Sequence, residues 1–382
     1  MQSSCMRLET IVRSLQKLLI FIFAAASTPL CIADGLEDLG KALFADVNLS
    51  RNRSLACATC HAPDFAYTDT RPGARQQGVS TGDDGLSLAR RHTPTLTYID
   101  HTPPFAATID GSYEGGFFYD GRAASLAEQA QGPLLSPLEM GMPDTTEIAA
   151  RITENAGYIQ ALKSLFGPDV MDSPATIFKA VTIALSAFQM SGTTSSFDSK
   201  YDRFLAGEEA LNALEEQGRL LFFSTLVNCN TCHLIDRLKR ETFTNYSYHN
   251  IGIPANVSLA RIYTKDLGLA EHPEVEDPKT RGQFKVPTLR NIAVTAPYMH
   301  NGVFKELRTV LAFYNQFILQ TPINPESGNV WRPPEVDENL SHDLLRRGQP
   351  LNPARMEAIM AFLMTLTDKR YEPLLDQLYI QP

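Results

Sequence analysis

Two short segments carry the same reactive pattern, in which two cysteines stand three positions apart and a histidine follows the second. The residues are Cys57, Cys60 and His61 in one segment, and Cys229, Cys232 and His233 in the other. Two thiols at this spacing can each form a thioether to one vinyl group of a porphyrin, and the histidine can ligate the iron. The pattern therefore predicts two covalently bound c-type haems.

Two other kinds of site use paired cysteines. Two Cys-x-x-Cys units can form a structural zinc site, but here a histidine follows each pair and the pairs lie far apart. A redox-active dithiol does not need the neighbouring histidine that occurs in both copies. The other cysteines, Cys5 and Cys31, precede the expected mature chain, so the haems would use all of its cysteines.

The first 33 residues read as a secretory signal peptide. Basic residues precede an apolar run at 18–26, and small residues stand three places and one place before a cut after Ala33. The run is shorter than the about 20 residues that span a bilayer. We therefore expect a periplasmic protein with no membrane span once the signal is removed. A lipid anchor on Cys31 and an uncleaved anchor are the alternatives.

The chain is acidic, with a formal net charge of −9, which excludes nucleic acid as an expected partner. Its hydrophobic content of 43% is typical of a soluble globular protein. The length left after residues 1–33 suits two domains of ordinary size.

The two halves of the chain repeat a pattern ahead of the cysteines. Segments 39–44 and 217–222 each combine a glycine, a basic residue and apolar residues, and each is expected to open a helix that leads into a haem loop. The polar segment 191–196 breaks the chain between them. We expect an N-terminal haem domain at 34–195 and a C-terminal haem domain at 196–382.

Apolar spacing predicts helices at 177–190, 307–317 and 353–366. Polar segments with glycine and proline at 71–84 and 322–338 are expected to be long loops. Strand signals are weak. The predicted fold is mainly α, with two cytochrome c-like haem domains packed together and little sheet.

Several further motifs resemble those of the bacterial di-haem cytochrome c peroxidase and MauG family. They read FYDGRAASL at 118–126, PLEMG at 137–141, FKVPTLRN at 284–291 and APYMHNG at 296–302. With segment 39–44 they cover nearly the whole mature chain, in the family's order. The resemblance implies a haem-dependent oxidoreductase that reacts with hydrogen peroxide.

The resemblance implies that Tyr314, counted from His300, is the distal ligand of the second haem. Ordinary di-haem peroxidases carry methionine there, whereas MauG-like members carry tyrosine. A phenolate is a hard anionic donor that stabilises oxidised iron. Without the resemblance, Tyr314 could instead be a core aromatic residue of helix 307–317, which is the more common role of a tyrosine in such a position. Met299 is the rival ligand.

The first haem is expected to lack a protein ligand on its distal face. The loop 62–91 contains no histidine, where ordinary di-haem peroxidases supply a displaceable one. His92 is the first histidine after the motif and stands where the family usually has asparagine. We expect the first iron to be open or water-bound, with a surface or hydrogen-bonding role for His92.

An open haem needs a group that moves a proton between the peroxide oxygens. A carboxyl in an apolar pocket can have its pKa raised enough to do so. Glu139 matches the family's distal acid, with Pro133 in its pocket and Gln129 close by in sequence. Taken alone, Glu139 is either a helix-start acid or a buried functional one.

The resemblance also places Tyr119 between the haems, where the family commonly has an electron-mediating tryptophan. Val227 stands ahead of the second motif, where MauG has a surface tryptophan, and the only tryptophan here is Trp331. The family binds calcium between its domains through two backbone carbonyls, which match Thr295 and Pro297, and through the asparagine that His92 replaces. Because calcium prefers oxygen ligands, that replacement counts against a bound ion.

Three functions fit these features. The first is a MauG-like enzyme, in which peroxide forms a high-valent di-haem state that oxidises a protein substrate. In the family this completes tryptophan tryptophylquinone in the methylamine dehydrogenase precursor. The second is a cytochrome c peroxidase that takes electrons from a small c-type cytochrome or cupredoxin. The third is a non-enzymatic electron carrier, which would need ligands on both faces of both irons. Tyr314 and the loop without histidine favour the first.

Overall fold

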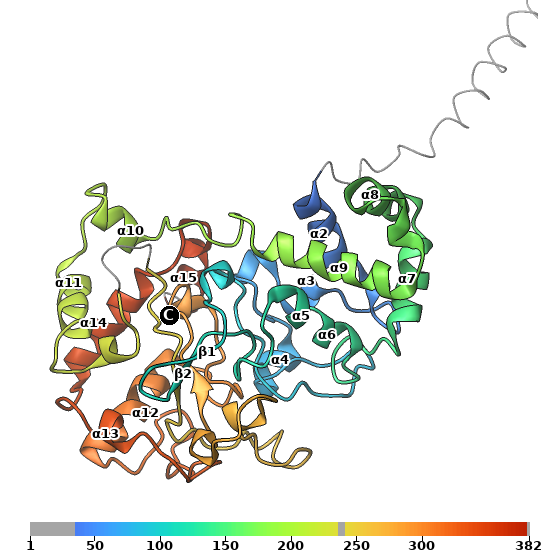
Figure 1. The fold of residues 1–382 in the computed structure, drawn as a ribbon. Helices are drawn as coiled ribbons and strands as arrows, with labels where there is room; N and C mark the ends of the chain where they lie inside the picture. Colours follow the sequence, from blue (N-terminus) through green and yellow to red (C-terminus); the bar gives the residue numbers. More distant parts are fainter. Residues whose placement is uncertain (1–34, 236–240, 380–382) are drawn as a thin grey trace, which may run out of the picture.

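A computed structural model describes residues 35–235 and 241–379 (Figure 1). The expected signal peptide at 1–33, with Cys5 and Cys31, lies outside these residues. Within the two described ranges, no helix combines the length and the apolar character needed to cross a bilayer.

The fold is mainly helical with little sheet, as the sequence predicts (Figure 1). The longer helices are α2 (Leu36–Phe44), α7 (Thr145–Thr153), α8 (Ala156–Phe166), α9 (Pro174–Gln189), α11 (Ala213–Phe222), α12 (Leu307–Leu319), α14 (Pro353–Met364) and α15 (Glu372–Tyr379). The shorter helices are α3 (Cys57–Cys60), α4 (Pro72–Gln77), α5 (Leu126–Gln129), α6 (Gln131–Leu135), α10 (Lys200–Leu205) and α13 (His342–Leu345).

Besides the α-helices and short 3-10 helices, the structure has two antiparallel strand pairs. Strand β1 (Ala106–Ala107) pairs with β2 (Tyr113–Glu114), and β3 (Tyr248–His249) pairs with β4 (Phe284–Lys285). In the second pair, Tyr248 lies opposite Lys285. This pair joins two segments that are distant in sequence and that both contribute to the site described below.

The helices form two hydrophobic cores, and the two groups of helices that build them lie side by side in Figure 1. One core is built from α2, α7, α8 and α9, and the other from α11, α12 and α14. The predicted helices at 177–190, 307–317 and 353–366 are confirmed as α9, α12 and α14. The domain boundary at 195 stays a prediction.

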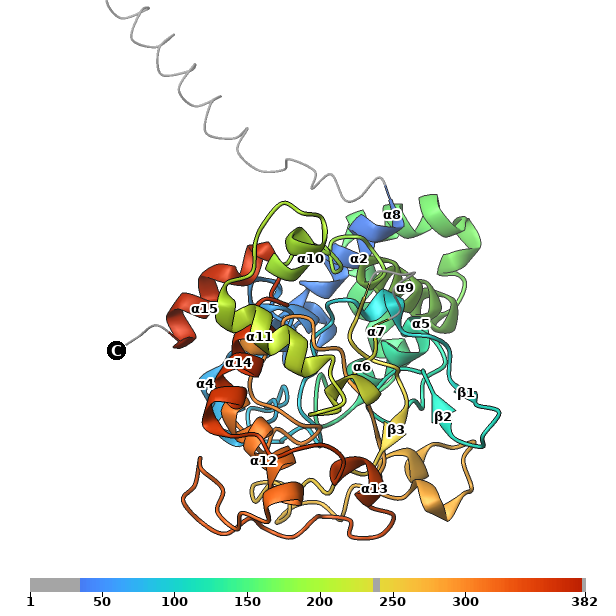
Figure 2. The ribbon, with the colours of Figure 1, turned by 90° about the vertical axis from the view of Figure 1, so that its left-hand side faces the viewer.

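The helix before each cysteine pair crosses a later helix at a glycine, and Figure 2 shows α11 lying against α14. A Cβ atom on Gly40 of α2 would stand 1.9 Å from the carbonyl oxygen of Ala184 in α9. A Cβ atom on Gly218 of α11 would stand 1.8 Å from the carbonyl oxygen of Ala358 in α14. The same close backbone approach in both halves supports the internal repeat seen in the sequence.

Two local predictions need correction. The repeated segments lie in the second part of α2 and α11 and do not open them, because these helices begin at Leu36 and Ala213. The predicted loop at 71–84 contains α4. Its start is favoured by Pro72, whose fixed φ suits the first helical position, and it ends at Gly78, where φ is 88°.

Replacing Gly218 with alanine should destabilise the C-terminal core by roughly 1–3 kcal/mol, because the added methyl forces α11 away from α14. The midpoint of thermal unfolding of the haem-loaded protein would measure the loss. Gly192→Ala is the matched control, since nothing lies within 4 Å of a Cβ atom there. Equal midpoints for the two variants would contradict the proposed helix contact.

Candidate haem sites

The first cysteine pair lies on α3, and the structure orients the histidine that follows it. The His61 backbone N–H donates to the Cys57 carbonyl at 2.8 Å, which folds the histidine back over the pair. The Nδ1 atom of His61 donates to the carbonyl of Tyr67 at 3.0 Å. An imidazole that donates through Nδ1 keeps the lone pair of Nε2 available to a metal, and the hydrogen bond fixes the ring.

The second pair uses the same arrangement. The His233 backbone N–H donates to the Cys229 carbonyl at 3.1 Å, and Nδ1 donates to the Phe243 carbonyl at 2.8 Å. Both acceptor residues have left-handed backbone, with φ at 56° for Tyr67 and 55° for Phe243. This conformation is uncommon for aromatic residues. Sequence reasoning missed both acceptors, because any residue can offer a backbone carbonyl.

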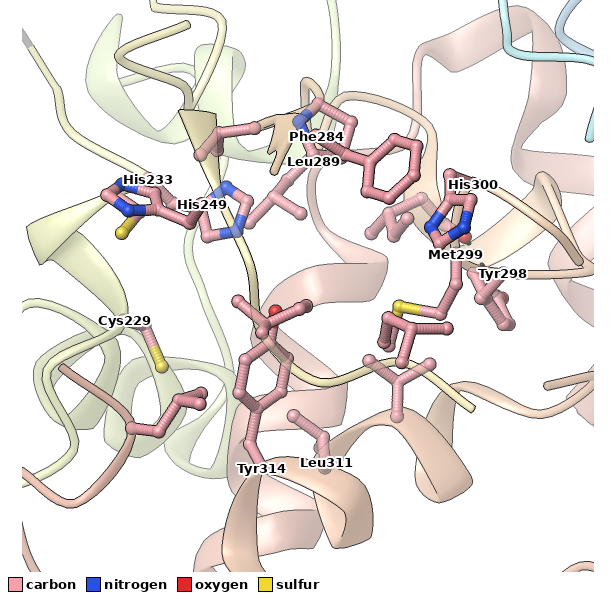
Figure 3. A pocket seen from close by; sticks show the side chains of 18 of the residues that line it. Cys229, His233, His249, Phe284, Leu289, Tyr298, Met299, His300, Leu311 and Tyr314 are labelled. Atoms are coloured by element: carbon pink, nitrogen blue, oxygen red, sulfur yellow. Dashed lines mark hydrogen bonds between the residues drawn. The ribbon is translucent and has the colours of Figure 1, made fainter. Parts of the chain in front are cut away.

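A cavity of about 320 Å³ adjoins the second pair and is lined by Cys229, Cys232, His233 and Tyr314. Figure 3 shows the Tyr314 ring pointing from α12 into this cavity. Burial raises the pKa of the Tyr314 phenol, and the charges of Cys232 and Cys229 raise it further. The phenol and both thiols therefore line the same cavity, as a distal group for a haem attached there must.

Other residues of the cavity wall include the rival ligand Met299, which lies with His300 on the side away from Cys229 in Figure 3. His300 stacks on Phe284 with ring centroids 3.5 Å apart. Burial lowers the pKa of His300 to about 3, so its ring is neutral. The described residues provide no hydrogen-bond partner for its Nε2.

His249 also lines the cavity and was not singled out in the sequence. It lies near His233 in Figure 3, and its Nε2 meets the Ser247 hydroxyl at 2.9 Å. Burial lowers its pKa. Its position depends on the pairing of β3 with β4, which joins distant segments and leaves no local signal in the sequence.

Glu139 lies beside the first cysteine pair. Its negative charge contributes to the raised pKa values of Cys57 and Cys60, which burial dominates. Burial also raises the pKa of Glu139 itself, and the positive charge of Arg122 opposes this only in part. A carboxyl near both thiols, with its pKa raised, is a suitable group for proton transfer at a haem attached there.

The backbone holds Glu139 in place. Its carbonyl accepts from the Asp83 N–H at 2.8 Å, and the Asp83 carboxylate accepts from the Ser54 hydroxyl at 2.7 Å. Gly82 allows this approach, because a Cβ atom there would stand 2.6 Å from the Leu138 carbonyl oxygen. Asp83 therefore joins the loop that leads into Cys57 to the segment that carries Glu139.

The two pocket residues near Glu139 are placed on short helices. Gln129 is half-buried on α5, and no hydrogen bond among the described residues joins its side chain to Glu139. Pro133 lies on α6, where its carbonyl accepts from the Met140 N–H at 3.1 Å. The roles expected for Gln129 and Pro133 stay predictions.

Tyr119 belongs to the N-terminal half but lines the cavity of the second pair. Its carbonyl accepts from the Lys285 N–H at 2.9 Å. The neighbouring Asp120 accepts from Arg91 at 2.7 Å, and Arg91 also donates to Asp266 of the other half at 2.7 Å. Tyr119 thus lies next to the ion pairs of Arg91 with Asp120 and Asp266, which connect the two halves.

The residues at the expected calcium site offer one imidazole and two backbone carbonyls. His92, Thr295 and Pro297 all line the same cavity. His92 is buried, its Nδ1 meets the Gly78 carbonyl at 3.3 Å, and burial lowers its pKa to about 4. No cluster of three His, Cys, Asp or Glu residues occurs in the described ranges. Two carbonyls and a neutral imidazole fit calcium poorly.

Known proteins resemble the chain in sequence and fold. Residues 35–210 match the profile of di-haem cytochrome c peroxidases. The chain is 48% identical over 355 residues to the methylamine utilization protein MauG of Paracoccus denitrificans, with 90% of this chain and 91% of that protein covered. It is 31% identical over 273 residues to cytochrome c551 peroxidase of Nitrosomonas europaea, with 70% and 69% covered.

The structure of the di-haem peroxidase BthA from Burkholderia thailandensis has the same fold. Its TM-score is 0.79 at 31% identity, with 89% of this chain and 87% of that chain covered. Sequence, fold and the paired cysteine motifs agree. The chain therefore belongs to the di-haem cytochrome c peroxidase family that includes the MauG proteins, and it is a haem-dependent oxidoreductase.

Proposed function

We propose that this protein is a periplasmic enzyme of MauG type that uses hydrogen peroxide to oxidise a protein substrate. The mature chain would begin after residue 33 and hold one covalent haem c in each domain, at 34–195 and 196–382. The observation that carries the proposal is an asymmetry. A carboxyl, Glu139, lies near the first cysteine pair, whereas a phenol, Tyr314, faces the second.

The first site is arranged to activate peroxide. Cys57, Cys60 and His61 would hold a haem, and its iron would supply the Lewis acid for peroxide. Glu139 would take a proton from the nearer peroxide oxygen and return it to the departing one, which would assist O–O cleavage. The raised pKa of Glu139 makes its carboxyl a stronger base than an exposed one. Gln129 and Pro133 complete the pocket in this proposal.

The second site is arranged to store oxidising equivalents. Cys229 and Cys232 would attach the second haem, and with His233 and Tyr314 both as ligands its iron would not bind peroxide. A phenolate ligand favours oxidised iron more than the methionine of ordinary di-haem peroxidases does. Tyr119 would lie between the two haems. Its phenol has a raised pKa through burial, which Arg91 partly offsets.

The proposed substrate is a protein side chain, and the specific candidate is tryptophan tryptophylquinone maturation in the methylamine dehydrogenase precursor. The similarity to methylamine utilization proteins supports this choice. A peroxidase that takes electrons from a small c-type cytochrome or cupredoxin is the alternative, since cytochrome c peroxidases are also relatives. Tyr314 and the absence of histidine from 62–91 favour the first. Calcium takes no part in the proposal.

Adding one equivalent of peroxide to the fully ferric, haem-loaded enzyme tests this function. We expect a long-lived state that holds two oxidising equivalents, without prior reduction of either haem, because the first iron needs no ligand movement to react. Stopped-flow absorption would follow it. Rapid turnover with a reduced small cytochrome, together with no such state in the ferric enzyme, would instead identify a cytochrome c peroxidase.

Glu139→Gln should slow the reaction with peroxide by about 10²- to 10⁴-fold while both haems remain bound. In the wild type the rate should rise with pH through the raised pKa of Glu139, because the ionised carboxyl is the base. The variant should lack this rise. Glu128→Gln changes an exposed carboxyl on α5 and is the control. Wild-type rates in Glu139→Gln would exclude the proton-transfer role.

Tyr314→Phe should alter the absorption spectrum of the second haem only, and Tyr314→Met should raise its reduction potential, because a neutral thioether stabilises ferric iron less than a phenolate. Tyr263→Phe removes a hydroxyl that bonds the Leu88 carbonyl elsewhere and should change neither property. An unchanged spectrum in Tyr314→Phe would show that Tyr314 is not a ligand.

A further inference from the structure

The Phe243 carbonyl, which accepts from Nδ1 of His233, belongs to a backbone that needs support from its surroundings. Phe243 has a left-handed φ of 55°, and its side chain is fully buried. A residue other than glycine keeps this strained conformation only where the surrounding structure holds it. The direction of the carbonyl, and with it the hydrogen bond to His233, therefore depends on the contacts that fix segment 241–244.

Those contacts come from segment 286–290. Three side-chain hydrogen bonds of 2.7 Å join the two segments: from Arg290 Nε to the Glu241 carbonyl, from the Thr288 hydroxyl to the Thr242 carbonyl, and from the Thr244 hydroxyl to the Val286 carbonyl. They fix the backbone on both sides of Phe243. The two segments are distant in sequence, so this support exists only in the folded domain.

Arg290 is itself held by an ion pair and makes a further contact with Phe243. Its guanidinium donates two hydrogen bonds to the Asp202 carboxylate on α10, at 2.5 and 2.9 Å. Only 1% of the Arg290 side chain is exposed, so water competes little for these bonds. The guanidinium carbon lies 5.3 Å from the centre of the Phe243 ring, within cation–π range. Arg290 thus holds both the ring of Phe243 and the backbone before it.

The first site fixes its acceptor in a different way. The Tyr67 N–H donates to the Ala62 carbonyl at 2.9 Å, and the Ala62 N–H donates to the Thr68 carbonyl at 3.2 Å. The acceptor for His61 is therefore held by a short turn within its own loop. A change at Arg290 can therefore alter the second site and leave the first as an internal reference.

We propose that Arg290, paired with Asp202, is a positioning residue that sets how strongly His233 binds the second iron, an inference that rests on the proposed haem at the second cysteine pair. A well-aligned Nδ1–H hydrogen bond shifts electron density onto the imidazole and makes Nε2 a stronger donor. A stronger donor favours ferric iron and keeps the reduction potential low. In the proposed function, Arg290 thus acts together with Tyr314 to suit the second site to storing oxidising equivalents.

Redox titration of the haem-loaded protein, followed by absorption, tests this role in Arg290→Lys. Lysine keeps the positive charge but loses the fork that pairs with Asp202 and the Nε donor. We expect the potential of the second haem to rise, so that its ferric-to-ferrous ratio at the wild-type midpoint falls several-fold. The low-spin electron paramagnetic resonance signal should shift as well. The first haem should keep its potential and its high-spin signal.

Thr288→Val is a milder change to the same support. It removes the hydroxyl that donates to the Thr242 carbonyl, with no change in charge and little change in shape. The potential of the second haem should rise by less than in Arg290→Lys. This variant keeps the inference testable if Arg290→Lys does not fold.

Arg203→Lys is the matched control, because Arg203 lies on α10 beside Asp202 but also forms ion pairs with Glu209 and Glu372. It should leave both potentials unchanged, and a rise equal to that in Arg290→Lys would overturn the inference. A lower unfolding temperature in Arg290→Lys, with the potential and the low-spin signal of the second haem unchanged, would also overturn it, because the role of the residue would then be structural only.

These outcomes separate the inference from the proposed function. If the wild type accumulates two oxidising equivalents after peroxide but neither variant moves the potential of the second haem, the positioning role is wrong and the proposed function stands. If both variants raise that potential but the wild type accumulates no such equivalents, the proposed function is wrong and the positioning role stands.

Discussion

The hydrogen bond from a histidine Nδ1 to a backbone carbonyl determines what each half of this molecule can do. In both halves the acceptor belongs to an aromatic residue with left-handed backbone, Tyr67 or Phe243, and the bond fixes the imidazole that follows the cysteine pair. A haem held by such a cysteine pair and histidine would take its particular chemistry from the other groups that lie near the pair.

The two halves differ in that group, although their frameworks repeat. At Gly40 and Gly218 the helix before each cysteine pair makes the same close backbone approach to a later helix. The backbone of Glu139 is held by Asp83, which also bonds the loop that leads into Cys57, and Tyr314 enters the cavity of the second pair from α12. Arg91 ties the halves together through Asp120 and Asp266, beside Tyr119. In the proposed function, one repeated unit would thus provide both the site that activates peroxide and the site that stores oxidising equivalents.

Much of this could be predicted from the sequence, because the haem motifs are local and the helices carry their apolar spacing with them. The spacing identified α9, α12 and α14, and the family motifs identified Glu139 and Tyr314 as candidates. Contacts between distant segments could not be predicted. His249 reaches the cavity only through the pairing of β3 with β4, and the carbonyls of Tyr67 and Phe243 carry no side-chain signature. The sequence did not predict α4, because its residues are mostly polar and show no apolar spacing, although Pro72 and Gly78 are typical of a helix start and a helix end.

The central claim is that two identical attachment motifs hold irons with different coordination. Electron paramagnetic resonance of the fully ferric, haem-loaded protein tests this most directly, because spin state reports whether both faces of an iron are ligated. The account predicts one high-spin haem, with its distal face open beside Glu139, and one low-spin haem, ligated by His233 and Tyr314. Two low-spin signals of equal intensity would contradict it, since no open iron would then remain to react with peroxide.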